Sequence, residues 1–250
     1  MPTAATRLLA LLAGVFLQIT AVQAVSPIRF DGDLGGAAYM TEGVIRGQNS
    51  TPLFLPYAYF DYGRFYARVD TLGVKVLPWG FGSLEIAGRI SLEGYKASDT
   101  GIRGIQDRSS PVPIGIGSFQ ETQMGAFFLY AFHDFESSGS LLEATYVAEF
   151  HVGDWAFYPQ LGLERRSANY VSHLYGVSAA ESANSHLPAY MPGAATNLVL
   201  GLAGEIPLTG AWGLAWQWQH KRLGNAISDS PLVASKAQNS GYIAVTYHIP

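Results

Sequence analysis

The sequence predicts an all-β fold, specifically a transmembrane antiparallel up-and-down β-barrel. Three observations predict it: an export signal at the N-terminus, stretches in which apolar and polar residues alternate, and an unusual composition. Charged residues make up 14% of the chain and aromatic residues 13%, with 28 glycines. Soluble domains carry about 25% charged residues, whereas a membrane barrel needs an apolar band and aromatic girdles on its outer surface.

The first 24 residues are typical of a secretory signal peptide. Arg7 supplies the positive charge, residues 8–17 form an apolar run, and Val22-Gln23-Ala24 fits a cleavage site. The alternative, a membrane anchor, needs about 18 apolar residues in a row, and this run is shorter. We therefore expect residues 1–24 to be a signal peptide and residues 25–250 to form a single outer-membrane β-barrel domain.

Composition also argues against several functional classes. The chain has no cysteine, which excludes a lipid-modified cysteine, disulfides and thiolate metal sites. The net charge is −4, or −5 once Arg7 is removed, and no basic stripe indicates nucleic acid. The 6 histidines lack the close spacing of paired metal ligands. No cofactor, metal or nucleic-acid partner is therefore predicted.

The C-terminal stretch from Gly241 to Pro250 alternates strictly between two faces. One face carries Ile243, Val245, Tyr247 and Ile249, and the other carries Tyr242, Ala244, Thr246 and His248. This period of two predicts a strand with one apolar face. Because the strand lies at the C-terminus, we expect it to close the barrel.

The same alternation predicts strands along the rest of the chain. The clearest runs from Leu84 to Tyr95, which is long enough to cross a bilayer at a tilt. Further strands are predicted at 34–42, 53–61, 64–77, 123–133, 142–152, 155–164, 197–205 and 212–221. Residues 111–119 give a weaker prediction, because Pro111 and Pro113 cannot donate to a β-ladder.

Connection lengths set the number of strands. Three connections are long, at 97–110, 167–194 and 225–238. Outer-membrane barrels have long external loops and short periplasmic turns, so the two kinds should alternate. Twelve strands satisfy this rule if 111–119 is a strand and 64–77 folds as two strands near Asp70. Ten strands are the alternative if both assumptions fail.

Polar residues on the opposite strand faces should point into the barrel. This predicts a lumen polar network of Arg68, Glu85, Arg89, Glu93, Glu143, Glu149, Glu164 and Arg166, together with Gln160, Gln217, Gln219 and Lys221. Buried charges need partners, so we expect ion pairs that fill a narrow barrel. Open channels need about sixteen strands, which leaves a thin solute path as the alternative.

No group of side chains predicts catalysis. The candidates are His133-Asp134, His151 with Glu143 or Glu149, and His173 or His186 with a loop serine. A nucleophile, a base and an orienting group must converge in space, and the spacing selects no serine. We therefore expect a protein that is not an enzyme.

Two loop segments carry the most specific sequence pattern. The first is Tyr175-Gly176-Val177-Ser178-Ala179-Ala180-Glu181-Ser182-Ala183, followed by Leu187-Pro188-Ala189-Tyr190 and Pro192-Gly193. The second joins Arg222-Leu223-Gly224 to Asp229-Ser230-Pro231-Leu232-Val233. Ser178 and Glu181 have capping-box spacing, which predicts a short helix that ends before Pro188. Asp229-Ser230-Pro231 predicts a turn. We interpret both segments as structural, with contact to a partner as the alternative.

These motifs, with the alternating C-terminal strand, resemble the MipA/OmpV family of outer-membrane proteins. The resemblance covers nearly all of residues 25–250 and is sharpest from Asn169 onward. It implies a barrel in the lipid of a Gram-negative-type outer membrane, without catalytic residues. It also implies a scaffold that bridges a murein hydrolase of the lytic transglycosylase type and a penicillin-binding protein. A narrow solute channel and a surface adhesin are the alternatives. Family chains usually end in an aromatic residue, whereas this chain ends in Ile249-Pro250.

Overall fold

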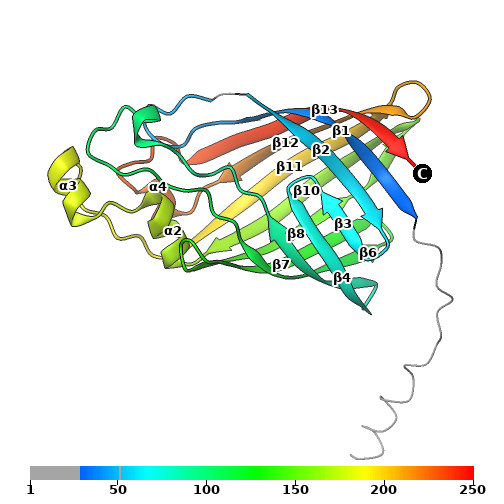
Figure 1. Cartoon of the computed structure of the whole chain (residues 1–250), viewed down its shortest axis with the longest axis horizontal. Helices are drawn as coiled ribbons and strands as arrows, with labels where there is room; N and C mark the ends of the chain where they lie inside the picture. Colours follow the sequence, from blue (N-terminus) through cyan, green and yellow to red (C-terminus); the bar gives the residue numbers. More distant parts are fainter. Residues whose placement is uncertain (1–28, 51) are drawn as a thin grey trace, which may run out of the picture.

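The computed structural model describes residues 29–50 and 52–250, and the expected signal peptide lies outside them. The described chain forms an antiparallel β-barrel (Figure 1). Its strands are β1 (Phe30–Thr41), β2 (Leu53–Tyr62), β3 (Phe65–Arg68), β4 (Thr71–Trp79), β5 (Gly82–Arg89), β6 (Ile114–Thr122), β7 (Gly125–Asp134), β8 (Gly139–Ala148), β9 (Phe150–Val152), β10 (Trp155–Arg166), β11 (Ala195–Pro207), β12 (Trp212–Arg222) and β13 (Ala237–Ile249). Its helices are a 3-10 turn (Ala97–Asp99), α2 (Ala168–Tyr175), α3 (Ala179–Ser185) and α4 (Asn225–Ser228).

The last strand closes the barrel, as the sequence predicts. β13 pairs with both β12 and β1, and Ile243 lies opposite Ala38 of β1. β9 continues β8 along the same edge of β10 and in the same register, so 12 strands surround the lumen. The break between β8 and β9 falls beside Pro159 of β10, because proline has no N–H to donate to the ladder.

Two weakly predicted segments turn out to be strands, which confirms the count of twelve. Residues 64–77 fold as β3 and the larger part of β4, separated by a turn at Val69-Asp70. Residues 111–119 contribute most of β6, which begins directly after Pro113. The alternative count of ten strands is therefore wrong.

The predicted strand from Leu84 to Tyr95 is wrong at its C-terminal end. β5 stops at Arg89, whose N–H donates to the carbonyl oxygen of Pro113 at 3.0 Å. Beyond Arg89, the segment that would pair with a longer β5 contains Pro111 and Pro113. Neither proline has an N–H group to extend the ladder. Residues 90–95 therefore leave the barrel wall, and a single bridge joins Tyr95 to Arg108.

The outer wall of the barrel is apolar. Exposed aliphatic side chains cover its middle: Leu72, Ile86, Ile116, Leu129, Leu142, Leu161, Leu163, Leu200, Ile243 and Val245. Exposed aromatic side chains gather near the short turns: Trp79, Phe81, Phe127, Phe150, Trp155, Trp212 and Tyr247. An apolar band with an aromatic girdle is the surface that a barrel presents to lipid. None of the helices in the described residues is long and apolar enough to cross a membrane.

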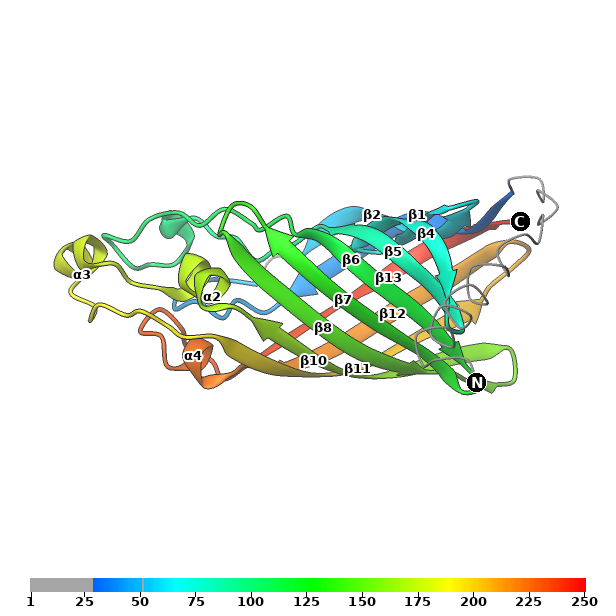
Figure 2. The same cartoon turned by 90° about the horizontal axis from the view of Figure 1, so that it is seen from below.

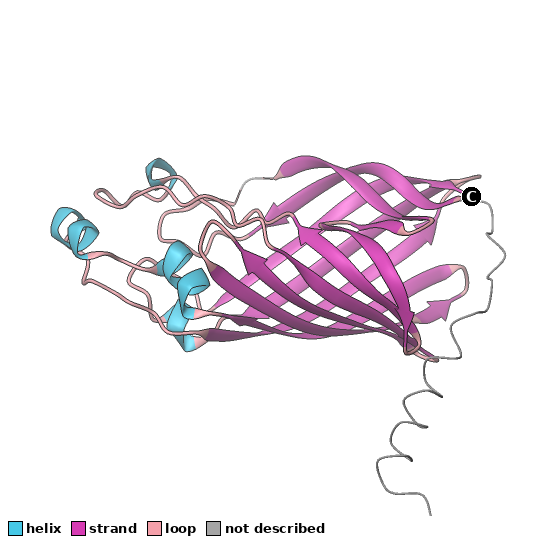
Figure 3. Ribbon diagram, turned by 60° about the horizontal axis from the view of Figure 1, so that its bottom comes forward, coloured by secondary structure: helices cyan, strands magenta, loops and turns pink. Residues whose placement is uncertain are grey.

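The two ends of the barrel differ in their connections. One end, the short-turn end, holds the turns at 63–64, 80–81, 123–124, 153–154 and 208–211, with the start of β1 and the end of β13. The other, the long-loop end, holds 42–50, 90–113, 167–194 and 223–236. The helices of the described residues all lie at the long-loop end (Figures 2 and 3). In outer-membrane barrels the short turns lie on the periplasmic side.

Candidate functional site

The long loops pack together as a cap over one mouth of the barrel. Its apolar core draws on all four loops: Val44, Ile45, Tyr95, Ile105, Tyr170, Val171, Leu174, Tyr175, Val177, Leu223, Ile227, Leu232 and Val233. Burial of a large apolar side chain contributes about 1.5–3 kcal/mol relative to exposure. The cap is therefore a folded layer, and its apolar core continues into the barrel through Ala87, Tyr130, Phe132, Leu141 and Ala195.

The first loop motif builds α3 through a complete capping box. Ser178 Oγ accepts a hydrogen bond from the Glu181 N–H at 3.2 Å, and Glu181 Oε2 accepts one from the Ser178 N–H at 2.9 Å. The helix ends at Ser185, before the exposed Pro188. The predicted short helix in a long loop is thus confirmed, and its cap satisfies two otherwise unpaired backbone donors.

The same glutamate ties two loops together. Glu181 is 4% exposed, and its Oε1 accepts hydrogen bonds from the Arg108 guanidinium at 2.7 Å and the Gln106 N–H at 3.0 Å. Arg108 also donates to the carbonyl oxygen of Gly176 at 3.2 Å. Burial acts to raise the pKa of Glu181, but hydrogen bonds from Ser178, Gln106 and Arg108 outweigh it and hold this pKa below its ordinary value.

The two loop motifs meet in the cap. Ser230 Oγ donates to the carbonyl oxygen of the buried Tyr175 at 2.6 Å, although the two residues lie 55 positions apart. The Tyr190 hydroxyl donates to the Ala226 carbonyl at 3.1 Å. Asp229 caps the C-terminal end of α4, and its N–H donates to the Asn225 carbonyl oxygen at 2.9 Å. Pro231 follows the buried Ser230. At Gly176 the Ser172 carbonyl oxygen lies so close that a Cβ would not fit. The motif residues thus form joints between the 167–194 and 223–236 loops.

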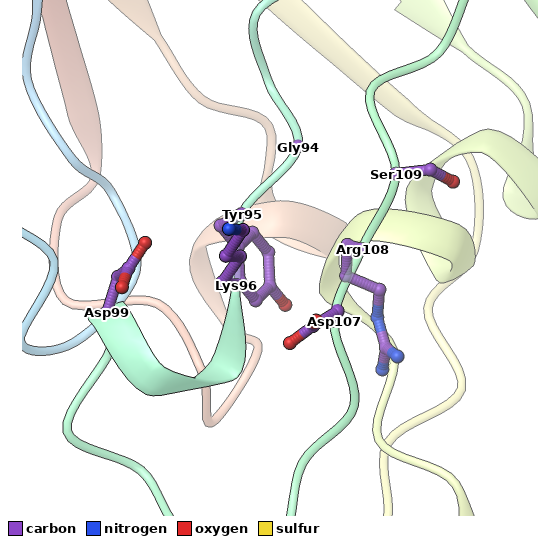
Figure 4. A pocket seen from close by; sticks show the side chains of 7 residues that line it. All are labelled: Gly94, Tyr95, Lys96, Asp99, Asp107, Arg108 and Ser109. Atoms are coloured by element: carbon purple, nitrogen blue, oxygen red, sulfur yellow. The ribbon is translucent and has the colours of Figure 1, made fainter.

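An open cleft of about 580 Å³ lies in the outer part of the cap. Figure 4 shows its residues on two adjoining segments of the 90–113 loop: Gly94, Tyr95, Lys96 and Asp99 on one, and Asp107, Arg108 and Ser109 on the other. Two acidic and two basic side chains line it. The cleft therefore favours neither sign of charge in a ligand.

One histidine does approach a loop serine. His173 Nε2 lies 3.5 Å from Ser109 Oγ, but it is 3.0 Å from the Ser109 carbonyl oxygen, to which only a protonated nitrogen can donate. The Ser109 hydroxyl donates to Glu136 at 2.8 Å. The ring nitrogen is therefore not placed as a base for this hydroxyl, as nucleophilic catalysis requires. Across residues 29–50 and 52–250, no group of three or more His, Cys, Asp or Glu could hold a metal.

Directly beneath the cap, the barrel interior holds a cluster of ion pairs. The Arg166 side chain is 2% exposed, pairs with Glu93, and places Nε 2.6 Å from Glu164 Oε1. Lys221 Nζ lies 2.8 Å from Glu164 Oε2. Tyr170 of α2 contributes its hydroxyl, 3.4 Å from Glu93 Oε2, and its ring, 5.1 Å from the Arg166 guanidinium. This cluster joins strands of the wall to a helix of the cap.

Further polar side chains also fill the lumen and bond to one another. Arg89 pairs with Glu143, and Arg68 pairs with Asp61 at 2.9 Å. The buried Glu85 accepts a hydrogen bond from the Tyr130 hydroxyl at 3.0 Å. The side-chain amides of Gln217 and Gln219 both donate to Gln160 Oε1, at 3.0 and 3.1 Å. Arg89 and Arg68 are therefore each paired with a carboxylate, whereas Glu85 is held by hydroxyl groups of Tyr130 and Ser83.

Glu149 is placed differently from the other predicted lumen residues. It lies at the break between β8 and β9 near the short-turn end, and its side chain is 50% exposed. Its carboxylate is 3.7 Å from His151, and no lysine or arginine pairs with it in the described part of the chain. Sequence reasoning also missed Arg108 and Gln106, because they lie 73 and 75 positions from Glu181 and no local spacing points to them.

A closed barrel with an apolar outer wall, an aromatic girdle and a paired polar interior is an outer-membrane β-barrel protein. The family model described as MltA-interacting protein MipA matches residues 34–249, and the chain belongs to this family.

Individual relatives are more distant. The chain is 26% identical to the MltA-interacting protein of Escherichia coli (strain K12) over 235 residues, which cover 91% of this chain and 93% of that protein. It is 25% identical to the outer membrane protein Omp26La of Vibrio anguillarum over 153 residues, 60% of this chain and 59% of that protein. The solved OmpT of Vibrio cholerae, also an outer membrane protein, aligns with 92% of this chain and 100% of its own, with a TM-score of 0.36 and 8% identity.

Proposed function

We propose that this protein is a non-catalytic scaffold of the outer membrane that holds a murein hydrolase of the lytic transglycosylase type. Membership of the MipA family and the name of the Escherichia coli relative, MltA-interacting protein, support this class of partner. A penicillin-binding protein is the second partner that we propose. Both would then work at one fixed place on the inner surface of the membrane.

One structural observation carries the proposal. The polar groups inside the barrel bond mainly to one another, as in the Arg166–Glu164 and Arg89–Glu143 pairs, and a packed cap covers the long-loop mouth. These groups are engaged within the chain, which leaves the surfaces at the two ends for binding. An enzyme that acts on peptidoglycan meets this barrel from the periplasm, where the short turns lie. The short-turn end is therefore the surface that we assign to the partner.

The proposal is tested by affinity capture of the tagged full chain from crosslinked envelopes, with the captured proteins quantified by mass spectrometry. An unrelated outer-membrane barrel of similar size is the matched control. We expect a lytic transglycosylase to be enriched with this chain over the control, and a penicillin-binding protein to be enriched less. Equal recovery of the transglycosylase with both baits would refute the scaffold.

A narrow channel has weaker physical support. Solutes would have to pass the cap and the ion pairs around Arg166 and Arg89, and breaking a buried ion pair costs about 3–5 kcal/mol. We expect planar-bilayer recordings of the folded protein to stay silent, and regular conductance steps would restore the channel hypothesis. The adhesin alternative rests only on the long loops, and we expect cells without the protein to attach normally.

A further inference from the structure

A groove of about 380 Å³ opens at the short-turn end of the barrel. It lies where β9 to β13 and β1 begin or end, close to the turns at 153–154 and 208–211. Ala156, Pro207 and Ala215 give it an apolar part. Sites of about 300–1,000 Å³ accommodate small ligands or a few side chains, so the groove is large enough for a short peptide segment.

The charged side chains that line this groove are all acidic. Asp33, Asp154 and Glu205 line it together with His151 and His248, whereas no lysine or arginine of the described residues does. Glu205 accepts a hydrogen bond from the Tyr158 hydroxyl at 3.3 Å, and Asp33 lies 3.2 Å from His248 Nδ1. Among the described residues none of the three carboxylates forms an ion pair with lysine or arginine, in contrast to Glu143 and Glu164 deeper in the barrel.

We infer that this groove docks a basic segment of the periplasmic partner, an inference that rests on the proposed scaffold function. The lysine or arginine side chains of the segment would face Asp33 and Glu205, and its apolar atoms would lie against Ala156 and Pro207. Complementary charge speeds encounter and fixes orientation, while the apolar contact supplies affinity.

Charge also selects among the other occupants. A second copy of this chain, docked end to end, would bring the same carboxylates against one another. The repulsion between these like charges would weaken the contact. An anionic lipid headgroup would meet the same repulsion. A basic protein segment is therefore the occupant that the groove favours, and the other two are outcomes that the experiment below can detect.

Site-specific photocrosslinking locates the contact. A photoreactive amino acid is placed in the full chain at Ala211, which lines the groove, or at Met124, an exposed residue in another turn of the same end. We expect Ala211 to crosslink to the lytic transglycosylase, within a segment that carries at least two lysine or arginine residues, and Met124 not to. A crosslink to an acidic segment, to a second copy of this chain or to lipid would overturn the inference.

Charge removal provides the second measurement. The double variant Asp33→Asn/Glu205→Gln keeps side-chain size, and Glu121→Gln is its control at an exposed strand end of the same side. Two lost surface charge pairs should weaken capture of the transglycosylase about tenfold, and the control should capture it normally. Heat-modifiable mobility shows whether each barrel has folded. Asp154→Asn, in an exposed turn, gives a second variant if the double variant does not fold.

The outcomes separate the two proposals. If the wild-type chain captures the transglycosylase and the groove variants capture it equally well, the groove inference fails and the scaffold stands. If the wild-type chain captures none, the scaffold fails and the groove inference fails with it.

Discussion

Two sets of acidic side chains, one at each end of this barrel, have opposite surroundings. At the long-loop end, Glu181 and Glu164 are buried and bonded to arginine or lysine of the same chain. At the short-turn end, Asp33 and Glu205 border an open groove without such partners in the described residues. A buried carboxylate that its own chain neutralises is tied to its cation, because removal of that cation would leave an unpaired buried charge. A carboxylate that borders an open groove without a cation remains available to a partner, and the predictions below probe this contrast.

The largest effect is expected from Arg166→Leu. The substitution leaves Glu164 and Glu93 without their shared guanidinium, and removal of one partner from a buried ion pair costs about 3–5 kcal/mol. We expect the urea midpoint of unfolding, followed by heat-modifiable mobility in detergent, to fall sharply. The neighbouring Arg165→Leu is the control, because Arg165 is exposed and contacts Thr196. Similar midpoints for the two variants would show that the interior cluster does not stabilise the fold.

Acid should loosen the cap through Glu181. Because its folded pKa lies below the ordinary value, the carboxylate stabilises the cap fully above the ordinary carboxyl pKa of about 4.3. This stabilisation is lost as the pH falls through the lower, folded pKa. The facing charge on Arg108 persists at these pH values, and burial raises the pKa of the adjacent Tyr95 to about 12, so that this phenol stays neutral.

Hydrogen exchange of the α3 amides, corrected for intrinsic rates, measures this effect. Protection should be constant from pH 7 to about pH 5 and should fall below about pH 4. In Glu181→Gln, protection should be lower at pH 7 and should no longer change with acid. A wild-type profile that is flat down to pH 3 would show that the Glu181 contacts do not hold the loops together.

Ser178→Ala should have a smaller effect that is confined to the cap. Loss of an N-cap side chain costs about 1 kcal/mol, so limited proteolysis of the folded barrel should cleave the 167–194 loop faster. Asn184→Ala, on the exposed side of the same helix, is the control. The unfolding midpoint of the barrel should hardly change in either variant. Equal cleavage rates would contradict the role of the capping box.

Local patterns in the sequence predict the barrel well. Alternation at Ile243, Val245 and Tyr247 predicts the closing strand, and the rule of alternating connections predicts that β3 and β4 are separate. The spacing of Ser178 and Glu181 predicts α3. Each of these features depends on residues close together in the chain or on a counting rule. The alternation of side chains does not show where a backbone N–H is missing. The pattern therefore extends the strand to Tyr95, whereas Pro111 and Pro113 end β5 six residues earlier.

The contacts of the candidate sites could not be predicted in the same way. Arg166 reaches Glu93 across 73 residues, and Arg108 reaches Glu181 across the same separation. Barrel register and loop packing decide these pairs, and no short motif encodes either. The polar faces of the predicted strands place the charged residues inside the wall. They do not show that Glu149 stays half exposed or that Asp33 and Glu205 meet at one groove.

The smallest expected effect tests which face of β13 contacts lipid near the short-turn end. Tyr247 is 44% exposed on the outer wall, and its ring meets that of Trp212 edge to face at 5.1 Å. His248 lines the groove instead. Tyr247→Ser should lower barrel stability by about 0.5 kcal/mol through the lost aromatic contact, and should reduce insertion into the outer membrane more than His248→Ser does. Insertion is measured as the fraction of heat-modifiable protein in outer-membrane fractions. Equal fractions for the two variants would contradict this assignment of faces, and with it the orientation of the groove residues on which the comparison of the two ends depends.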